Sequence, residues 1–194
     1  MNLSDFVTNS RRILSCYYYN VLELLAINNS FFNNLLLSWR KPVFSNEINM
    51  AKITKDHVVL LIGSGIFPSE AIQIAKETGA QVTGIDNSIK AVKLSKKYLI
   101  KNNISHIVKI EYADGSDISI REFDIIFIAI NVFPINSVLR NLSDQISVGT
   151  KIMCKSIKND IPQVLKNEGL DSSFDILDQL ENPRTQSYLL VKKE

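Results

Sequence analysis

A glycine-rich turn is the clearest candidate for a ligand-binding site in this sequence. Gly63, Ser64 and Gly65 come directly after the apolar run at residues 57–62 and are followed by a predicted helix. Glycine lets the backbone turn sharply and approach a ligand closely. The start of a helix offers free N–H groups and a partial positive charge, which suit a carboxylate or a phosphate. The pattern therefore predicts a ligand-binding turn or, alternatively, a tight strand-to-helix turn that binds nothing.

Two acidic residues stand where they could complete an adenosine site. Asp86 ends the second predicted strand, 23 residues after Gly63, where a carboxylate can accept both ribose hydroxyls. Its alternative role is to cap the helix that Asp86 and Asn87 open. Asp114 follows the third predicted strand, where it could accept a hydrogen bond from the adenine amino group or form an Asp-Gly turn. The candidate cofactor-binding residues are Gly63, Ser64, Gly65, Asp86, Asn87, Asp114 and Asn131.

A dinucleotide site is disfavoured at the same turn. The third glycine of the fingerprint G-x-G-x-x-G would fall at Pro68. Proline has no N–H to offer a pyrophosphate, and its ring hinders close packing of helix against strand. The predicted strands four and five also lack a Tyr-x-x-x-Lys pair nearby. An NAD-dependent oxidoreductase is therefore the weaker interpretation.

Short strands alternating with helices must position these residues. Continuous apolar runs such as His57–Ile62 are typical of strands buried on both faces of a parallel sheet. Strand–helix alternation with short connections predicts an α/β, doubly wound, Rossmann-like fold. The expected strands are 57–62, 81–85, 107–112, 124–130 and 151–156, with helices at 69–78, 89–100, 134–145 and 161–168. The last two strands, 174–177 and 188–192, should form a hairpin at one edge.

The first 49 residues differ from the rest. Apolar side chains from Leu3 to Leu25 recur at spacings of three and four and predict a helix that Asn28 to Ser30 interrupt. A second helix over Phe31–Trp39 should end before Pro42. Neither helix could bury its apolar stripe alone, so both should pack on the downstream domain. We therefore divide the chain into a helical extension, 1–49, and a nucleotide-binding domain, 50–194.

Taken together, the glycine turn, Asp86 and Asp114 resemble the three cofactor-contacting motifs of the class I S-adenosylmethionine-dependent methyltransferases. The resemblance covers roughly residues 55–194 and includes the terminal hairpin. It implies strand order 3-2-1-4-5-7-6, with strand seven antiparallel, and S-adenosylmethionine as cofactor. By this resemblance the turn would hold the methionine end, Asp86 the ribose and Asp114 the adenine amino group. The sequence departs from the family at Phe67, where a third glycine is common.

A narrower resemblance is to the nicotianamine synthases. Their glycine turn also carries a proline at the position of Pro68, and the run from Tyr17 to Asn20 is similar to the tyrosine-rich helix before their nucleotide-binding domain. Those enzymes keep the methyltransferase fold but transfer the aminobutanoyl arm of S-adenosylmethionine. Their helical N-terminal domain is larger and contains a catalytic glutamate, to which we match no residue here. The tyrosines could equally be core residues of an amphipathic helix.

The sequence offers few candidate catalytic residues, and transfer from a sulfonium needs few. The sulfonium is already a good leaving group, so positioning and exclusion of water can supply most of the acceleration. Asn131 follows strand four, where amino-group methyltransferases often carry Asn-Pro-Pro-aromatic, a motif that this sequence does not match. Asn131 could orient a substrate, contact the cofactor or cap the turn, and Tyr18 could line an acceptor pocket under a lid formed by the N-terminal helices. These are the candidate catalytic residues.

The expected function is methyl transfer to a small molecule. The alternatives are aminobutanoyl transfer and a non-catalytic module that binds a partner through its N-terminal helices. Composition predicts neither a nucleic-acid nor a membrane partner, because 22 basic residues face 20 acidic ones and no apolar stretch approaches a membrane span. A homodimer is compatible with the sequence.

Cysteine, histidine and lysine usage adds few sites. Cys16 and Cys154 form no C-x-x-C pair, and a buried free thiol at Cys154 points to a reducing, cytoplasmic compartment. No cluster has the spacing of a metal site, and His57 and His106 are expected to be ordinary strand-end residues. We expect the lysines near strand five to form a solvated rim or, as the second choice, an anion-binding site; they are Lys151, Lys155 and Lys158.

Overall fold

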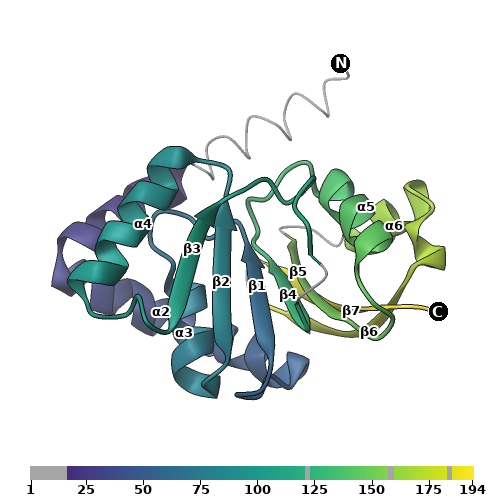
Figure 1. Cartoon of the computed structure of the whole chain (residues 1–194), viewed down its shortest axis with the longest axis horizontal. Coiled ribbons are helices and arrows are strands. Elements are labelled where there is room, and N and C mark those ends of the chain that lie inside the picture. The colour runs from purple at the N-terminus through teal and green to yellow at the C-terminus, as the bar shows by residue number, and fades with distance from the viewer. Residues whose placement is uncertain (1–16, 121–122, 157–159, 183–184) are drawn as a thin grey trace.

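A single twisted sheet organises the molecule (Figure 1). The computed structural model describes residues 17–120, 123–156, 160–182 and 185–194. Seven strands follow the order β3-β2-β1-β4-β5-β7-β6. Their bounds are β1 (Val58–Ile62), β2 (Gln81–Asp86), β3 (Val108–Tyr112), β4 (Ile125–Ile128), β5 (Lys151–Ser156), β6 (Phe174–Glu181) and β7 (Gln186–Lys192). Strands β1 to β5 pair in parallel, and β7 runs antiparallel to β5 and β6, which confirms the predicted order and hairpin.

The central strands are covered on both faces, which explains their continuous apolar runs. In β1, Val59 and Leu61 pack into one hydrophobic cluster, whereas Leu60 and Ile62 pack into the other. The first cluster is shared with α2 (Ser30–Ala51), α3 (Ser69–Thr78) and α4 (Ile89–Lys101), and the second with α5 (Ile135–Gln145) and α6 (Ile161–Asn167). A short 3-10 turn, η1 (Leu170–Ser172), follows α6. Because both faces of β1 are buried, an alternation of polar and apolar residues would be unfavourable there.

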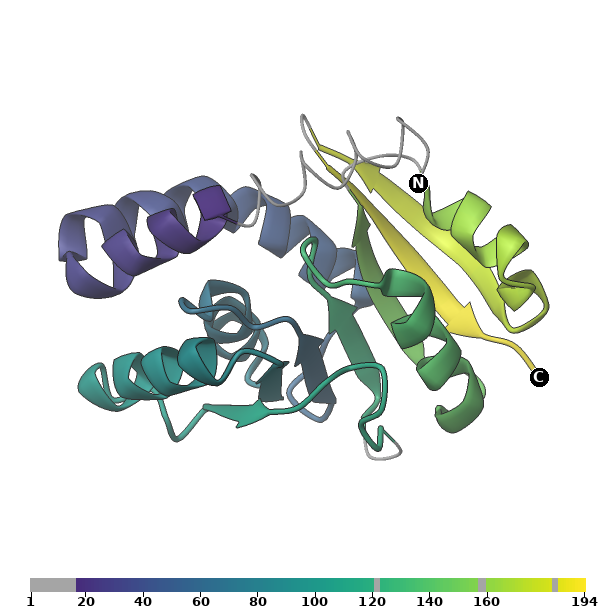
Figure 2. The ribbon, with the colours of Figure 1, turned by 90° about the horizontal axis from the view of Figure 1, so that it is seen from above.

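Helix α2 is longer than predicted. It continues through Pro42 to Ala51, although a proline inside a helix costs about 3 kcal/mol. Buried side chains on both sides of the proline, Leu36 before it and Phe44 and Ile48 after it, hold the two halves of the helix against the domain. This packing outweighs the lost hydrogen bond. Figure 2 shows α2 running past α3 towards β5 and β7, so the helix crosses the boundary proposed at residue 49.

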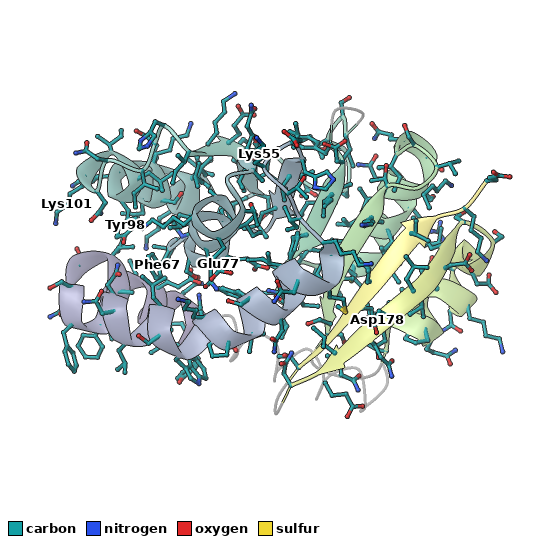
Figure 3. All side chains as sticks on the ribbon, turned by 90° about the horizontal axis from the view of Figure 1, so that it is seen from below. Lys55, Phe67, Glu77, Tyr98, Lys101 and Asp178 are labelled. Atoms are coloured by element: carbon teal, nitrogen blue, oxygen red, sulfur yellow. The ribbon has the colours of Figure 1, made fainter. Side chains whose placement is uncertain are left out.

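The preceding helix also packs on the domain. Residues 17–28 are helical, and Asn29 caps α2 by accepting hydrogen bonds from the backbone N–H groups of Phe31 and Phe32. The predicted interruption is thus confirmed, while Leu3 to Leu14 lie outside the described residues. Asn33 donates to the hydroxyl of Tyr98 at 2.7 Å, and the Tyr98 ring meets Phe67 edge-on at 5.1 Å between centroids (Figure 3). Asn33 therefore links α2 to α4, and Ala26 of the preceding helix is buried in the first hydrophobic cluster.

The thiol of Cys154 is free and buried, as expected from the sequence. Burial raises its pKa well above the ordinary range, so the thiol stays protonated. Cys16 lies outside the described residues. Within the part of the chain that the structure describes, none of the helices has the length and apolar character to cross a membrane.

Candidate functional site

A cavity of about 890 Å³ opens at the carboxyl ends of the central strands. In open α/β sheets this edge is where ligands bind. The cavity is lined from β1, β2 and β4 and by the segments that follow them. All of the residues predicted to bind the cofactor line it; they are Gly63, Ser64, Gly65, Asp86, Asn87, Asp114 and Asn131. The structure therefore brings together residues that are up to 68 positions apart in the sequence (131 − 63).

The glycine turn is held to the end of β2 by its own backbone. The N–H groups of Gly63 and Ser64 both donate to the Ile85 carbonyl, at 2.8 and 2.9 Å. Gly65 donates to Asp86 Oδ2 at 2.9 Å. Gly63 and Gly65 have φ angles of +84° and +71°, in the left-handed region that favours glycine. This turn therefore requires both glycines.

The two predicted aspartates lie at the ends of the neighbouring strands β2 and β3. Asp86 also accepts from the Ser88 N–H at 2.9 Å. Asp114 accepts from the N–H and the hydroxyl of Ser116, at 2.9 and 2.7 Å, and from Asn87 Nδ2 at 3.2 Å. These donors lower the pKa of Asp114 and keep it ionised. Each carboxylate oxygen has a second lone pair, so both aspartates can still accept hydrogen bonds from a ligand.

Three buried polar atoms of residues that line this cavity have no hydrogen-bond partner among the described residues. They are Ser64 Oγ, Asn131 Oδ1 and Asn182 Nδ2. An unsatisfied buried polar group costs about 1–3 kcal/mol, so a ligand that pairs with it gains that energy. Asn182 follows β6 and was not predicted as a site residue, because nothing near it in the sequence indicates that the terminal hairpin reaches the cavity.

Glu23 enters the site from the helical segment 17–28. Its Oε2 accepts hydrogen bonds from the backbone N–H groups of Ile66, at 2.9 Å, and Phe67, at 3.3 Å. Its Oε1 lies 3.3 Å from Arg40, which also donates to Ser69 at 3.0 Å. Only 12% of the Glu23 side chain is exposed, and burial raises its pKa against the opposing effects of Arg40 and the two amides. No local sequence signal assigned Glu23 a role.

Lys155 is buried, contrary to the prediction. It was predicted to belong to a solvated rim, but its side chain is only 8% exposed. Its Nζ lies 2.9 Å from Glu47 Oε2, 2.6 Å from Glu70 Oε1 and 4.4 Å from the centre of the Phe44 ring. The expectation was wrong because α2 carries Phe44 and Glu47 over the end of β5. Burial alone would lower the pKa of Lys155, but the two carboxylates outweigh it and raise the pKa.

Glu23, Arg40, Glu47, Glu70 and Lys155 form what we call the charged network. It contains three carboxylates and two cations, so its formal charge is −1 when all are ionised. Burial raises the pKa of Glu70 as well as that of Glu23. All members except Glu47 line the cavity. The network therefore favours a positively charged group in the adjoining cavity over a negatively charged one.

The N-terminal tyrosines divide between the cavity and the surface. Tyr17 and Tyr19 line the cavity, and Arg40 lies 5.5 Å from the centre of the Tyr19 ring. Tyr18, the predicted catalytic tyrosine, is 52% exposed and is not among the lining residues. Its ring meets that of Tyr19 edge-on, with 5.8 Å between the centroids. The residues of this run that line the cavity are Tyr17, which is 70% exposed, and Tyr19, and the role of Tyr18 stays a prediction.

We expect Gly65→Ala to lower stability modestly and to displace Glu23. A left-handed φ costs a residue with a Cβ about 1–2 kcal/mol, and the new Cβ would lie 2.6 Å from Glu23 Oε2. Gly169→Ala is the matched control, because Gly169 has φ +68° and a Cβ there would meet none of the described residues within 4 Å. Urea denaturation of both variants separates backbone strain from the clash. Equal losses of stability would show that the Glu23 contact at the turn contributes nothing.

Comparison with known proteins gives two kinds of match. Residues 40–137 match the model of the alanine dehydrogenase/PNT C-terminal domain, an NAD(P)-binding Rossmann family. No curated protein matches the sequence. The matched stretch includes β1 to β4 but not β5, β7 and β6, whose antiparallel arrangement distinguishes the methyltransferase fold.

Solved structures are similar to most of the chain. An RNA methyltransferase from Salinibacter ruber in complex with S-adenosyl-L-homocysteine is 20% identical, with a TM-score of 0.64 over 79% of this chain and 92% of that one. A mutant of MtNAS in complex with S-adenosylmethionine is 18% identical, with a TM-score of 0.74 over 89% and 71%. A putative S-adenosyl-L-methionine-dependent methyltransferase from Methanococcus maripaludis is 17% identical, with a TM-score of 0.71 over 89% and 94%. At these identities the likeness shows the class I methyltransferase fold.

Proposed function

We propose a function from two premises: over residues 40–137 the chain belongs to the alanine dehydrogenase/PNT C-terminal domain family, and its complete sheet has the class I methyltransferase fold. The chain uses the Rossmann half of the sheet, which contains β1 to β4, to bind S-adenosylmethionine. It transfers the methyl group to a small molecule. The observation that carries this proposal is the convergence of the glycine turn, Asp86 and Asp114 on one cavity. The structural neighbours with bound S-adenosylmethionine or S-adenosylhomocysteine support the same cofactor.

The residues present fit this cofactor. Asp86 and Asp114 retain lone pairs for the ribose hydroxyls and the adenine amino group, and Asn87 fixes the position of Asp114. The glycine turn would face the methionine end, near the surplus negative charge of the charged network. S-adenosylmethionine carries a positive sulfonium and a positive ammonium group, which such a field stabilises. The carboxylate of the methionine end needs a donor, and the unpaired polar atoms of the cavity include two, Ser64 Oγ and Asn182 Nδ2.

The chain's own residues would act by positioning. When bound, the cofactor supplies a methyl group on a sulfonium, which is a good leaving group. Tyr17, Tyr19 and Phe133 line the cavity and would exclude water from an acceptor. Asn131, with an unpaired Oδ1, would orient the acceptor or the cofactor. In such a transfer a lone pair of the acceptor would form the new bond to carbon, the carbon–sulfur bond would break with its electron pair left on sulfur, and the methylated acceptor would then lose its proton to solvent.

A labelling experiment tests which group is transferred. The protein is incubated with S-adenosylmethionine labelled in the methyl group and with a small-molecule fraction of a cell extract. We expect label in a small acceptor and an equal amount of S-adenosylhomocysteine, both measured by mass spectrometry. Label that stays in methylthioadenosine would instead show that another carbon next to sulfur is transferred.

Aminobutanoyl transfer is the second candidate, and one observation favours it. The MtNAS structure aligns with 89% of this chain, a span that must include part of the N-terminal helices. These helices bring a buried carboxylate, Glu23, to the glycine turn. In this reaction the product is methylthioadenosine, so the labelling experiment distinguishes the two candidates. Release of neither product would favour a non-catalytic module.

A further inference from the structure

We propose that Glu23 sets the cofactor specificity of the site by occupying the backbone amides that would otherwise bind a diphosphate. The inference rests on the proposed function and deepens it. It explains why a chain with a match to an NAD(P)-binding family would bind an S-adenosyl compound instead. The geometry that carries it is the pair of hydrogen bonds from Ile66 and Phe67 to a single carboxylate oxygen.

The amides of the turn are satisfied within the protein. Gly63 and Ser64 donate to Ile85, and Gly65 donates to Asp86. The next two amides donate to Glu23, and Pro68 has no N–H. Ser69 donates to the Phe67 carbonyl at 2.7 Å. Every backbone N–H from residue 63 to residue 67, and that of residue 69, therefore already has an acceptor.

A diphosphate could use this turn only by displacing Glu23. Dinucleotide sites bind the pyrophosphate at the amides between strand and helix. Here that position holds a carboxylate whose side chain is only 12% exposed and which Arg40 pairs from the other side. Gly65 leaves room for this carboxylate, since any Cβ at that position would lie 2.6 Å from Glu23 Oε2. A phosphate brought to this turn would find the N–H groups of Ile66 and Phe67 already occupied and would be repelled by the negative charge of Glu23.

The same carboxylate is compatible with an S-adenosyl compound. The adenosine half is identical in both cofactor classes and is served by Asp86 and Asp114, so selection must act at the 5′ substituent. An amino acid chain bears an ammonium group where a nucleotide bears phosphates. Glu23 attracts the first and repels the second, and Glu70 adds negative charge to the same wall.

Paired titrations test the inference. S-adenosylhomocysteine and ADP share adenosine and differ in the 5′ group, and both are titrated calorimetrically into the wild type, Glu23→Gln and Glu23→Ala. We expect the wild type to prefer S-adenosylhomocysteine and both variants to reduce the ratio of the two affinities by about tenfold or more, since two like charges brought together in a desolvated site cost at least this much. Glu23→Ala should reduce it further, because the two amides and Arg40 are then free for a phosphate.

Glu77→Gln is the matched control. It removes the same charge from an exposed residue near the far end of α3, where Glu77 contacts Ser45 and Gln73 but does not line the cavity (Figure 3). We expect no change in its affinity ratio. Glu23→Gln preserves the shape of the side chain, so it remains informative if Glu23→Ala fails to fold. Folded Glu23 variants with the wild-type ratio would overturn the inference. A wild type that binds ADP but not S-adenosylhomocysteine would instead refute the proposed function.

Discussion

Lys155→Met is expected to destabilise the protein by about 3–5 kcal/mol at pH 7, the usual cost of removing one partner from a buried ion pair. The lysine Nζ contacts Glu47 and Glu70 at 2.9 and 2.6 Å. The side chains of Lys155, Glu47 and Glu70 are 8%, 0% and 10% exposed, so water screens their charges very little. Methionine replaces the aliphatic stem but not the ammonium, so two carboxylates remain buried together. Urea denaturation at pH 7 measures the loss.

The double variant Lys155→Met/Glu70→Gln shows whether charge is the cause. Because the second change removes one of the two stranded carboxylates, we expect it to recover part of the lost stability, a coupling that a double-mutant cycle measures. If the double variant loses the sum of the two single losses, Lys155 acts by packing against Phe44 and the ion-pair interpretation fails.

The Lys155→Met loss should also depend on pH. Burial already raises the pKa of Glu70 above 4.5, and removal of the cation raises it further. The folded variant then holds a proton that the unfolded chain has lost. Its stability therefore rises as the pH falls from 7 towards 4.5, by up to about 1.4 kcal/mol per pH unit for one proton. A gap between variant and wild type that stays constant over this range would contradict the explanation.

Asp86→Ala is expected to weaken S-adenosylhomocysteine binding by about 10- to 100-fold, since hydrogen bonds to a charged group contribute about 1.5–3 kcal/mol. The carboxylate would bind the ribose, and it also accepts from the backbone N–H groups of Gly65 and Ser88. Its loss therefore removes a ligand contact and loosens the turn that faces the methionine end. Calorimetric titration measures the affinity.

Asp175→Ala is the control for this change. Asp175 is an exposed residue of β6 that pairs with Lys193 and does not line the cavity, so the same substitution there should leave the affinity unchanged. If Asp86→Ala also binds normally, Asp86 serves only as the anchor of the helix that begins at Ile89, and the ribose assignment is wrong.

The sheet and half of the site followed from local sequence signals. Strands such as β1 are continuous apolar runs because both faces are buried, and parallel strands place their carboxyl ends at one edge. For that reason Gly63, Asp86 and Asp114 could be placed together from the sequence alone. Their neighbours in the sequence carry the signal, since each lies at the end of a predicted strand or shortly after it.

The rest of the site depends on long-range packing that no local pattern reveals. Glu23 reaches amides 43 and 44 positions away, and Lys155 meets Glu47 over 108 positions (155 − 47). Glu47 lies in α2 and Glu23 in the helical segment before it, so both contacts depend on how these helices pack on the domain, whereas Pro42 predicted that α2 would end early. The charge of each side chain is plain in the sequence, but its burial is a consequence of how that helix packs.

We expect the cavity to recognise an S-adenosyl compound and not a dinucleotide, and a competition titration of the wild-type protein decides between the two. The protein is mixed with an excess of NAD⁺, and S-adenosylhomocysteine is then titrated into it in a calorimeter. We predict that S-adenosylhomocysteine binds with the same affinity as it does without NAD⁺, because the dinucleotide does not occupy the cavity. Tight NAD⁺ binding that blocks S-adenosylhomocysteine would instead make the chain a dinucleotide-binding protein on a methyltransferase-like sheet.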